Sequence, residues 1–229
     1  KFILIASSIT NSMIIDGVVL FYLSLMKQII YFFAMFYGIP YSSFAQSVLF
    51  VDGNATGVNN GSTWVNAFIH LNTALQYAQS GDTIWVAAGE YRATTDGNRD
   101  SSFILKNGVA IYGGFNGTET SFFQRDFRQH LTILSGDIGI PNQTTDNSYN
   151  VVFGSGLDST TIIDGFIIEK GVANNTNAAE ANLRRKQGGG MFLESIFSAD
   201  CNPIVRNCIF RNNYASSAAA AFFAGGSTS

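Results

Sequence analysis

The feature that most constrains this chain is an internal repeat. The segment Thr161–Gly171 aligns without gaps on Pro203–Asn213, at an offset of 42 residues. In each copy two short apolar runs meet at a corner residue, Gly165 or Asn207, and these residue types tolerate a left-handed backbone most readily. Self-similarity at a fixed period is typical of a solenoid, in which stacked units bury one continuous core.

The repeat also predicts which side chains face the interior. The aligned apolar positions are Ile163 with Val205, Phe166 with Cys208, and Ile168 with Phe210. Stacking the two copies places these side chains in one interior file. The offset is longer than an ordinary solenoid coil, and we assign the excess to Val172–Gln187, a polar segment expected to be a loop inserted at a corner.

From Gln46 onward, short apolar runs end at Gly, Asn or Asp, which is the pattern of strands that end in turns. One stretch differs, because Ala67–Ala78 places apolar residues three and four positions apart and so predicts one amphipathic helix. No second helix is long enough for a strand–helix–strand crossover, which leaves a sandwich or a solenoid, and the repeat favours the solenoid. The strand candidates are Thr83–Val86, Ser102–Leu105, Val109–Tyr112, Leu131–Leu134, Asn150–Phe153, Thr161–Ile163, Phe166–Ile168, Gly190–Leu193, Ile204–Val205 and Cys208–Phe210.

Composition narrows the class of partner. Of the 229 residues, 46% are hydrophobic and 13% are charged, which is a globular composition with about half the usual charge. A net charge of −3 provides no basic surface for nucleic acid or for anionic lipid. Cys201 and Cys208, the two cysteines, are too few for a disulfide framework or a four-thiolate zinc site. We therefore expect no nucleic-acid partner and no metal held through sulfur.

The N-terminal residues predict export. Met26-Lys27 precedes a strongly apolar run, and Ser43-Phe44-Ala45 supplies the small residues that a signal peptidase needs. We expect an upstream segment over residues 1–25, a signal peptide over 26–45 cleaved after Ala45, and an exported domain over 46–229. In the alternative, Gly17–Tyr37 is retained as a membrane anchor.

Export implies a secreted or cell-surface protein, in which polysaccharides and other surfaces are the available partners. The sequence opens on Lys1 and closes in small residues at Ala218–Ser229, so we expect a fragment that stops within the solenoid. Membrane contact is then expected only through the N-terminal segment or through a C-terminal anchor beyond the fragment.

Several phrases of the exported part point to one family. They are Val51–Gly57, Gly81–Tyr91, Val109–Glu119, Thr132–Ile138, Gly188–Met191 and Asn202–Cys208. From about Val48 to Ser229 the chain resembles the pectate-lyase-like proteins, in particular bacterial surface proteins with polymorphic-outer-membrane-protein-type repeats. The resemblance implies a right-handed parallel β-helix solenoid with three strands per coil, whose N-terminal mouth is capped by the helix at Ala67–Ala78. It specifies a scaffold rather than a reaction.

Some members of that family are polysaccharide lyases, which hold calcium beside an acidic sugar and abstract a proton with Arg or Lys. Asp137, Asp158 and Asp164 lie in or near successive coils and are candidate calcium ligands, and Asp137 and Asp164 are also candidate catalytic acids. Arg184 and Arg185 lie in the densest basic cluster and are candidate bases. Hydrogen bonds to turn backbone are favoured for the acids, since calcium needs six or more oxygens, and a solvated loop is favoured for the arginines.

Two further groups near the N-terminal mouth have a candidate binding role. Asp52, Asn54 and Asp82 together supply oxygens for a cation, although Asp52-Gly53-Asn54 is equally a turn and Asp82 equally a residue at a strand entry. Trp64 and Trp85 can stack on sugar rings, but burial against the cap helix is favoured.

The sequence thus favours a module without catalysis. It contains neither a Gly-x-Ser-x-Gly elbow nor a His-Glu-x-x-His motif. The leading hypothesis is an exported β-helix that binds carbohydrate or another surface and needs no cofactor. The alternative is a polysaccharide lyase or glycoside hydrolase, with calcium as the cofactor of a lyase.

Overall fold

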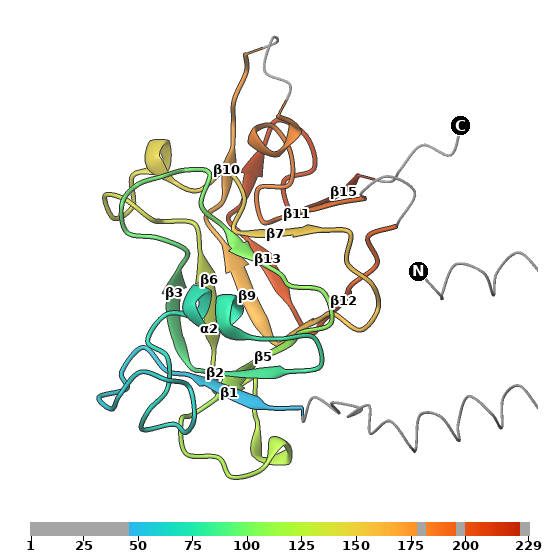
Figure 1. The fold of residues 1–229 in the computed structure, drawn as a ribbon. Helices are drawn as coiled ribbons and strands as arrows, with labels where there is room; N and C mark the ends of the chain where they lie inside the picture. Colours follow the sequence, from blue (N-terminus) through green and yellow to red (C-terminus); the bar gives the residue numbers. More distant parts are fainter. Residues whose placement is uncertain (1–45, 178–181, 196–199, 225–229) are drawn as a thin grey trace, which may run out of the picture. The chain divides into compact units, whose positions relative to one another are not determined.

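A computed structural model describes residues 46–177, 182–195 and 200–224 (Figure 1). The described residues belong to one compact unit, Ala45–Ser229. The expected upstream segment, signal peptide, membrane anchor and cleavage point lie outside the described residues and stay predictions. Within the described ranges, no helix has the length and apolar character needed to cross a membrane.

The described chain consists mostly of strands in parallel sheets, with few helices, as predicted. Sheet A has the order β1-β2-β5-β8-β12, sheet B β3-β6-β9-β13, sheet C β4-β7-β11-β15 and sheet D β10-β14. The strands of sheet A are β1 Val48–Val51, β2 Thr83–Ala87, β5 Ala110–Phe115, β8 Ile162–Asp164 and β12 Ile204–Arg206. Those of sheet B are β3 Gly89–Arg92, β6 Thr132–Ser135, β9 Phe166–Glu169 and β13 Ile209–Arg211. Sheet C contains β4 Phe103–Ile104, β7 Val152–Ser155, β11 Met191–Glu194 and β15 Ala221–Ala224, and sheet D contains β10 Val172–Ala173 and β14 Tyr214–Ala215.

From β2 onward the chain passes through sheets A, B and C in turn, and we call one such round a circuit. Each strand then pairs in parallel with its counterpart in the neighbouring circuit, as β3, β6, β9 and β13 do side by side in Figure 1. In the last two circuits sheet D is added between sheets B and C. Parallel neighbours therefore come from segments that are dozens of residues apart.

The predicted repeat is confirmed by the strand register. Ile162 pairs with Ile204 and Ile167 with Ile209, each at the offset of 42 residues found in the sequence. The corner residues Gly165 and Asn207 have φ angles of 82° and 51°, in the left-handed region.

One boundary of the repeat needs correction. Val172 and Ala173 form strand β10, which pairs with β14 at the same offset, so the inserted loop begins after Ala173 rather than at Val172. The repeat therefore extends two residues further into the segment than its apolar pattern suggested.

The predicted interior file lies in the core shared by sheets A, B and C. Ile163, Phe166 and Ile168 are at most 1% exposed, and their aligned partners are partly buried against the same core. These partners lie on the last circuit, where no further strand covers them within the described residues. The repeat therefore gave the correct facing of both copies.

The predicted helix forms, but it is shorter than expected. Helix α2 covers Leu71–Tyr77, with Leu71 and Leu75 buried in the core. Phe68 instead pairs as an isolated bridge with Val51. The backbone N–H of Phe68 donates to the carbonyl oxygen of Phe50, and this contact covers the outer edge of β1. An extended segment, rather than the helix alone, therefore protects the first sheet edge.

All ten strand candidates overlap an observed strand. The strands not predicted are β1, β3, β10, β14 and β15. Most of these are short or carry glycine and polar residues, so that their apolar alternation is weak. The described residues also form the 3-10 helices η2 Phe122–Gln124, η3 Thr144–Asp146 and η4 Leu183–Arg185.

Candidate functional site

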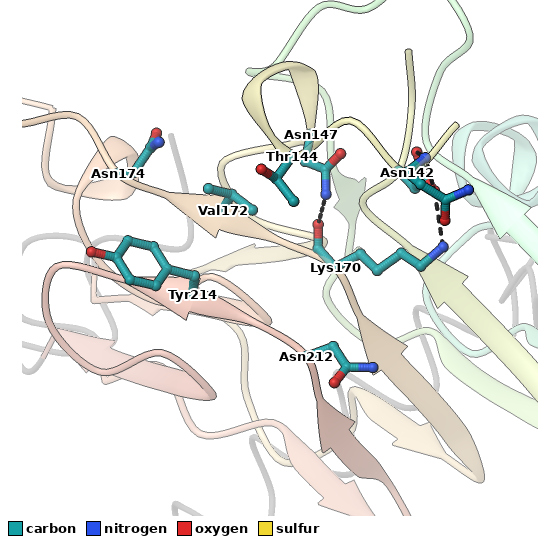
Figure 2. Close-up of a pocket in the computed structure, with 9 residues that line it drawn as sticks. Asn142, Thr144, Asn147, Lys170, Val172, Asn174, Asn212 and Tyr214 are labelled. Carbon is teal, nitrogen blue, oxygen red and sulfur yellow. Dashed lines mark hydrogen bonds and ion pairs between the residues drawn. The ribbon is translucent and has the colours of Figure 1, made fainter. Parts of the chain in front are cut away.

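A groove of about 640 Å³ lies beside the corners between β9 and β10 and between β13 and β14. Figure 2 shows its lining, which comes from the loop around η3 and from the two strand corners. Its volume falls within the roughly 300–1,000 Å³ typical of ligand sites. The lining residues are Asp137, Asn142, Thr144, Asn147, Lys170, Val172, Asn174, Asn212 and Tyr214.

The strand side of the groove is built from two successive circuits. Lys170 at the corner, Val172 on β10 and Asn174 just after β10 stand at alternate positions and all line the groove. Tyr214 pairs with Val172 across sheet D, and Asn212 stands two residues before Tyr214 as Lys170 stands before Val172. The repeat therefore supplies two matching rows of side chains to the same groove.

Three lining residues that are not glycine have a left-handed backbone. The φ angles are 65° at Asn142, 63° at Lys170 and 53° at Asn212. A left-handed lysine is unfavourable by about 1–2 kcal/mol and persists only where its surroundings hold it. The side chain of Asn147 provides such a contact, because its Nδ2 donates to the carbonyl oxygen of Lys170 over 2.7 Å.

The Lys170 side chain forms an ion pair with Asp137 in the groove. The Lys170 Nζ lies 2.9 Å from Asp137 Oδ2, and the side chains are 30% and 2% exposed. Burial by itself raises the pKa of Asp137, but hydrogen bonds from Lys170 Nζ and from the Asn142 N–H outweigh it and hold that pKa below its usual range. The same bond raises the pKa of Lys170. Both groups are therefore charged at neutral pH, and together they are neutral.

The rest of the groove is uncharged. The side chains of Asn142, Asn174 and Asn212 are exposed, and Tyr214 is 58% exposed. Among the described residues of the lining, Asp137 is the one carboxylate, and its oxygens already accept bonds from Lys170 and Asn142. Hydrolysis of a glycosidic bond needs two carboxylates facing each other, so the chemistry that this lining supports is hydrogen bonding and ring stacking.

Asp164, a second candidate from the sequence, lies outside the groove in an ion-pair network. It accepts bonds from Arg125 Nη2 at 2.7 Å, Arg206 Nε at 2.5 Å and Asn207 Nδ2 at 2.9 Å. Burial raises its pKa, yet these three donors outweigh burial and place the pKa below its usual range. Both carboxylate oxygens are therefore engaged by the chain itself.

The remaining candidate metal ligands cap turns and loops. Asp158 Oδ1 accepts from the Thr160 N–H at 2.8 Å, and Asp52 Oδ1 accepts from the Asn54 N–H at 2.9 Å. Asp82 accepts from the backbone N–H groups of Ser47 and Gln79. Among the residues that the structure describes, no group of three or more His, Cys, Asp or Glu side chains is placed to hold a metal ion.

The two candidate arginines lie apart from the groove and make different contacts. The Arg184 guanidinium lies 3.8 Å from the centre of the Phe153 ring, and its Nη2 donates to Ser102 Oγ. Burial lowers the pKa of Arg184. Arg185 instead pairs with Asp100 at 2.8 Å. The prediction that both arginines lie in a solvated loop is therefore wrong for Arg184, which packs on Phe153 at the outer face of sheet C.

The two tryptophans are partly or largely buried, but not against the cap helix. Trp85 stacks on Phe115 with ring centres 4.7 Å apart, and Trp64 packs on Phe50 and Phe115. Because side chains alternate along a strand, Trp85 faces away from the core that its neighbours Ile84 and Val86 share with α2. The prediction of burial against the helix is therefore wrong for this face.

Sequence reasoning selected Asp137 but missed the rest of the groove. The signal was present in part, because the alternation at Lys170, Val172 and Asn174 continues the repeat beyond its apolar positions. The facing loop at Asn142–Asn147 carries no such pattern. Its position depends on contacts with a later circuit, including the bond from Asn147 to Lys170.

Comparison of the chain with family models, with curated proteins and with solved structures finds no match in any of the three.

Proposed function

We propose that the described chain belongs to a right-handed parallel β-helix that is exported and binds carbohydrate or another surface without catalysing a reaction. The passage of the chain through three parallel sheets in turn supports this architecture. Right-handed crossovers account for nearly all connections between parallel strands, which supports the hand.

The observation that carries the proposal is the groove lined by Lys170, Asn212 and Tyr214 together with the η3 loop. Amide side chains both donate and accept hydrogen bonds, as the hydroxyl groups of a sugar require. The exposed ring of Tyr214 adds an apolar face with a polar tip. Because the two matching rows come from stacked circuits, a linear ligand can run across them.

Binding without turnover is favoured by the state of the acids. Asp137 and Asp164 are both held by cationic side chains, so neither offers a free carboxylate for proton transfer or for calcium. A lyase is the second candidate function. It is favoured by one observation, the position of the partly buried Arg184 guanidinium 3.8 Å from the centre of the Phe153 ring, since a base of this kind needs desolvation.

The test uses the full-length protein on a glycan array and in a cell-adhesion assay, together with an ultraviolet assay for unsaturated uronates. We expect saturable binding with no change in the ligand. Accumulation of unsaturated products, lost in an Arg184→Ala variant, would replace this proposal with the lyase.

A further inference from the structure

We infer that the groove takes an uncharged, hydroxyl-rich glycan, bound without calcium, with Tyr214 as its stacking face. This inference rests on the proposed function and specifies its ligand class. Three observations carry it: the balance of charge in the lining, the free amide groups, and the position of the aromatic ring.

The charge of the lining excludes a preference for acidic sugars. Lys170 is the one cation among the lining residues that the structure describes, and its ammonium is bonded to Asp137. A uronate carboxylate entering the groove would have to compete with that buried partner for the same ammonium group. A calcium ion bridging protein and uronate needs six or more oxygens, whereas the described part of the lining holds a single carboxylate that is already bonded. A ligand with no net charge avoids both penalties.

Three amide side chains of the lining have groups that are available to bond a ligand. The Oδ1 of Asn174 accepts from Arg99 Nη2 at 2.9 Å, and Arg99 is itself fixed by a bond to the Val172 carbonyl oxygen. Asn174 lines the groove, and its Nδ2 makes no hydrogen bond to the described residues, so this donor is available to a ligand. The side chains of Asn142 and Asn212 likewise bond to none of the described residues. The groove therefore offers three amides to a ligand that both donates and accepts, as vicinal hydroxyls do.

Tyr214 supplies the apolar contact. It opens strand β14 and lies beside Val172, which is 7% exposed, so its ring forms the wall of a groove that is otherwise polar. Aromatic rings present a broad apolar face, and the C–H faces of a sugar ring pack on such a face. An apolar peptide is a poorer occupant, because Val172 is the one aliphatic side chain in the lining as far as the chain is described.

The experiment measures binding of the full chain to neutral and uronate oligosaccharides of equal length, each with calcium and with EDTA. The key variant is Tyr214→Ala, and its control is Phe123→Ala, which removes a ring that is 94% exposed and does not line the groove. We expect binding of a neutral oligosaccharide that EDTA leaves unchanged, about tenfold weaker in the Tyr214 variant and unaltered in the control.

A second pair isolates an amide. Asn212→Gly removes the side chain and keeps a residue that accepts the φ of 53°. Its control is Ala218→Gly, at a position with the same φ of 53° outside the groove. We expect a several-fold loss of affinity in the first variant and none in the second, with equal thermal midpoints showing that both still fold.

The outcomes separate this inference from the proposed function. Binding that is confined to uronates, that needs calcium, or that is unchanged in both groove variants overturns the inference and leaves the proposed function in place. Adhesion to a protein or lipid surface with no glycan bound does the same. Absence of all binding overturns both.

Discussion

Arg125 Nη2 donates to Asp164 Oδ1 over 2.7 Å, and the two side chains are 7% and 2% exposed. The pair joins the segment between β5 and β6 to strand β8. Arg206 extends it to β12, because its Nε bonds to the other carboxylate oxygen at 2.5 Å. A single buried carboxylate therefore connects three successive circuits.

The first prediction concerns acid. The pKa of Asp164 in the folded protein lies below its usual value of 3.8, because its bonded donors outweigh the effect of burial. A carboxylate with a lowered pKa contributes stability that is present above its usual pKa and is lost as the pH falls through the lowered one. We expect the free energy of unfolding to begin to fall near pH 4 and to continue to fall below it. Urea unfolding at several pH values, in the wild type and in Asp164→Asn, measures this dependence.

The Asp164→Asn variant should lose about 3 kcal/mol at neutral pH, since it leaves the buried Arg125 without its ionic partner. It should also lack part of the fall in acid. Equal slopes of stability against pH in the two proteins would show that Asp164 is not the group responsible.

The second prediction concerns the corner at Gly165. A Cβ atom there would lie 1.9 Å from Arg125 Nη2 and 3.0 Å from Phe127 Cβ, at a φ of 82°. Gly81→Ala is the matched control, because Gly81 has a φ of 97° and nothing within 4 Å of the added atom. We expect the control to lose about 1 kcal/mol through backbone strain alone, and Gly165→Ala to lose about 2 kcal/mol or more. Equal losses in chemical denaturation would mean that the corner tolerates the added methyl group.

The third prediction tests the interior file. Ile168 is fully buried and pairs with Leu134 on one side and Phe210 on the other. Ile168→Ala should lose about 2–5 kcal/mol, because the neighbouring strands cannot close the cavity. Ile209 aligns with Ile167, the outward-facing neighbour of Ile168, and is 56% exposed, so Ile209→Ala should stay within about 0.5 kcal/mol of wild type. Similar losses at the two positions, measured by urea unfolding, would contradict the assigned facing.

The parts of the fold that the sequence predicts are those with local causes. The facing of Ile163 and Ile168 follows from alternation along each strand, and the corner at Gly165 follows from the backbone freedom of glycine. The offset between copies gives the register directly, since stacked parallel strands repeat their side-chain positions.

The parts that it does not predict depend on side chains from distant segments. Arg99 reaches the Val172 carbonyl oxygen 73 residues away, and no local pattern encodes that contact. Asp137 was selected as a candidate acid, but its partner Lys170 lies 33 residues later on a different corner. The burial of Trp85 also depends on distant segments, because its ring packs on Phe50 and Phe115, which come from other strands of sheet A. Groove and network alike arise where segments from separate circuits meet.

The last prediction separates binding from calcium-dependent lysis. Anything that binds the folded state alone raises the thermal midpoint in proportion to the logarithm of its concentration. The carboxylates of Asp137 and Asp164 are occupied by Lys170 and by two arginines, and a calcium ion would have to displace those cations. We therefore expect the thermal midpoint of the full chain to be the same with EDTA as with excess calcium. Lys170→Gln is the informative variant, because it removes the cation that is bonded to Asp137. The groove then still has a single carboxylate, which supplies too few oxygens for tight calcium binding, so calcium should leave the midpoint of this variant unchanged as well. A midpoint that rises with calcium in the wild type would show that these ion pairs open to admit the metal, and would favour the lyase over the binding module.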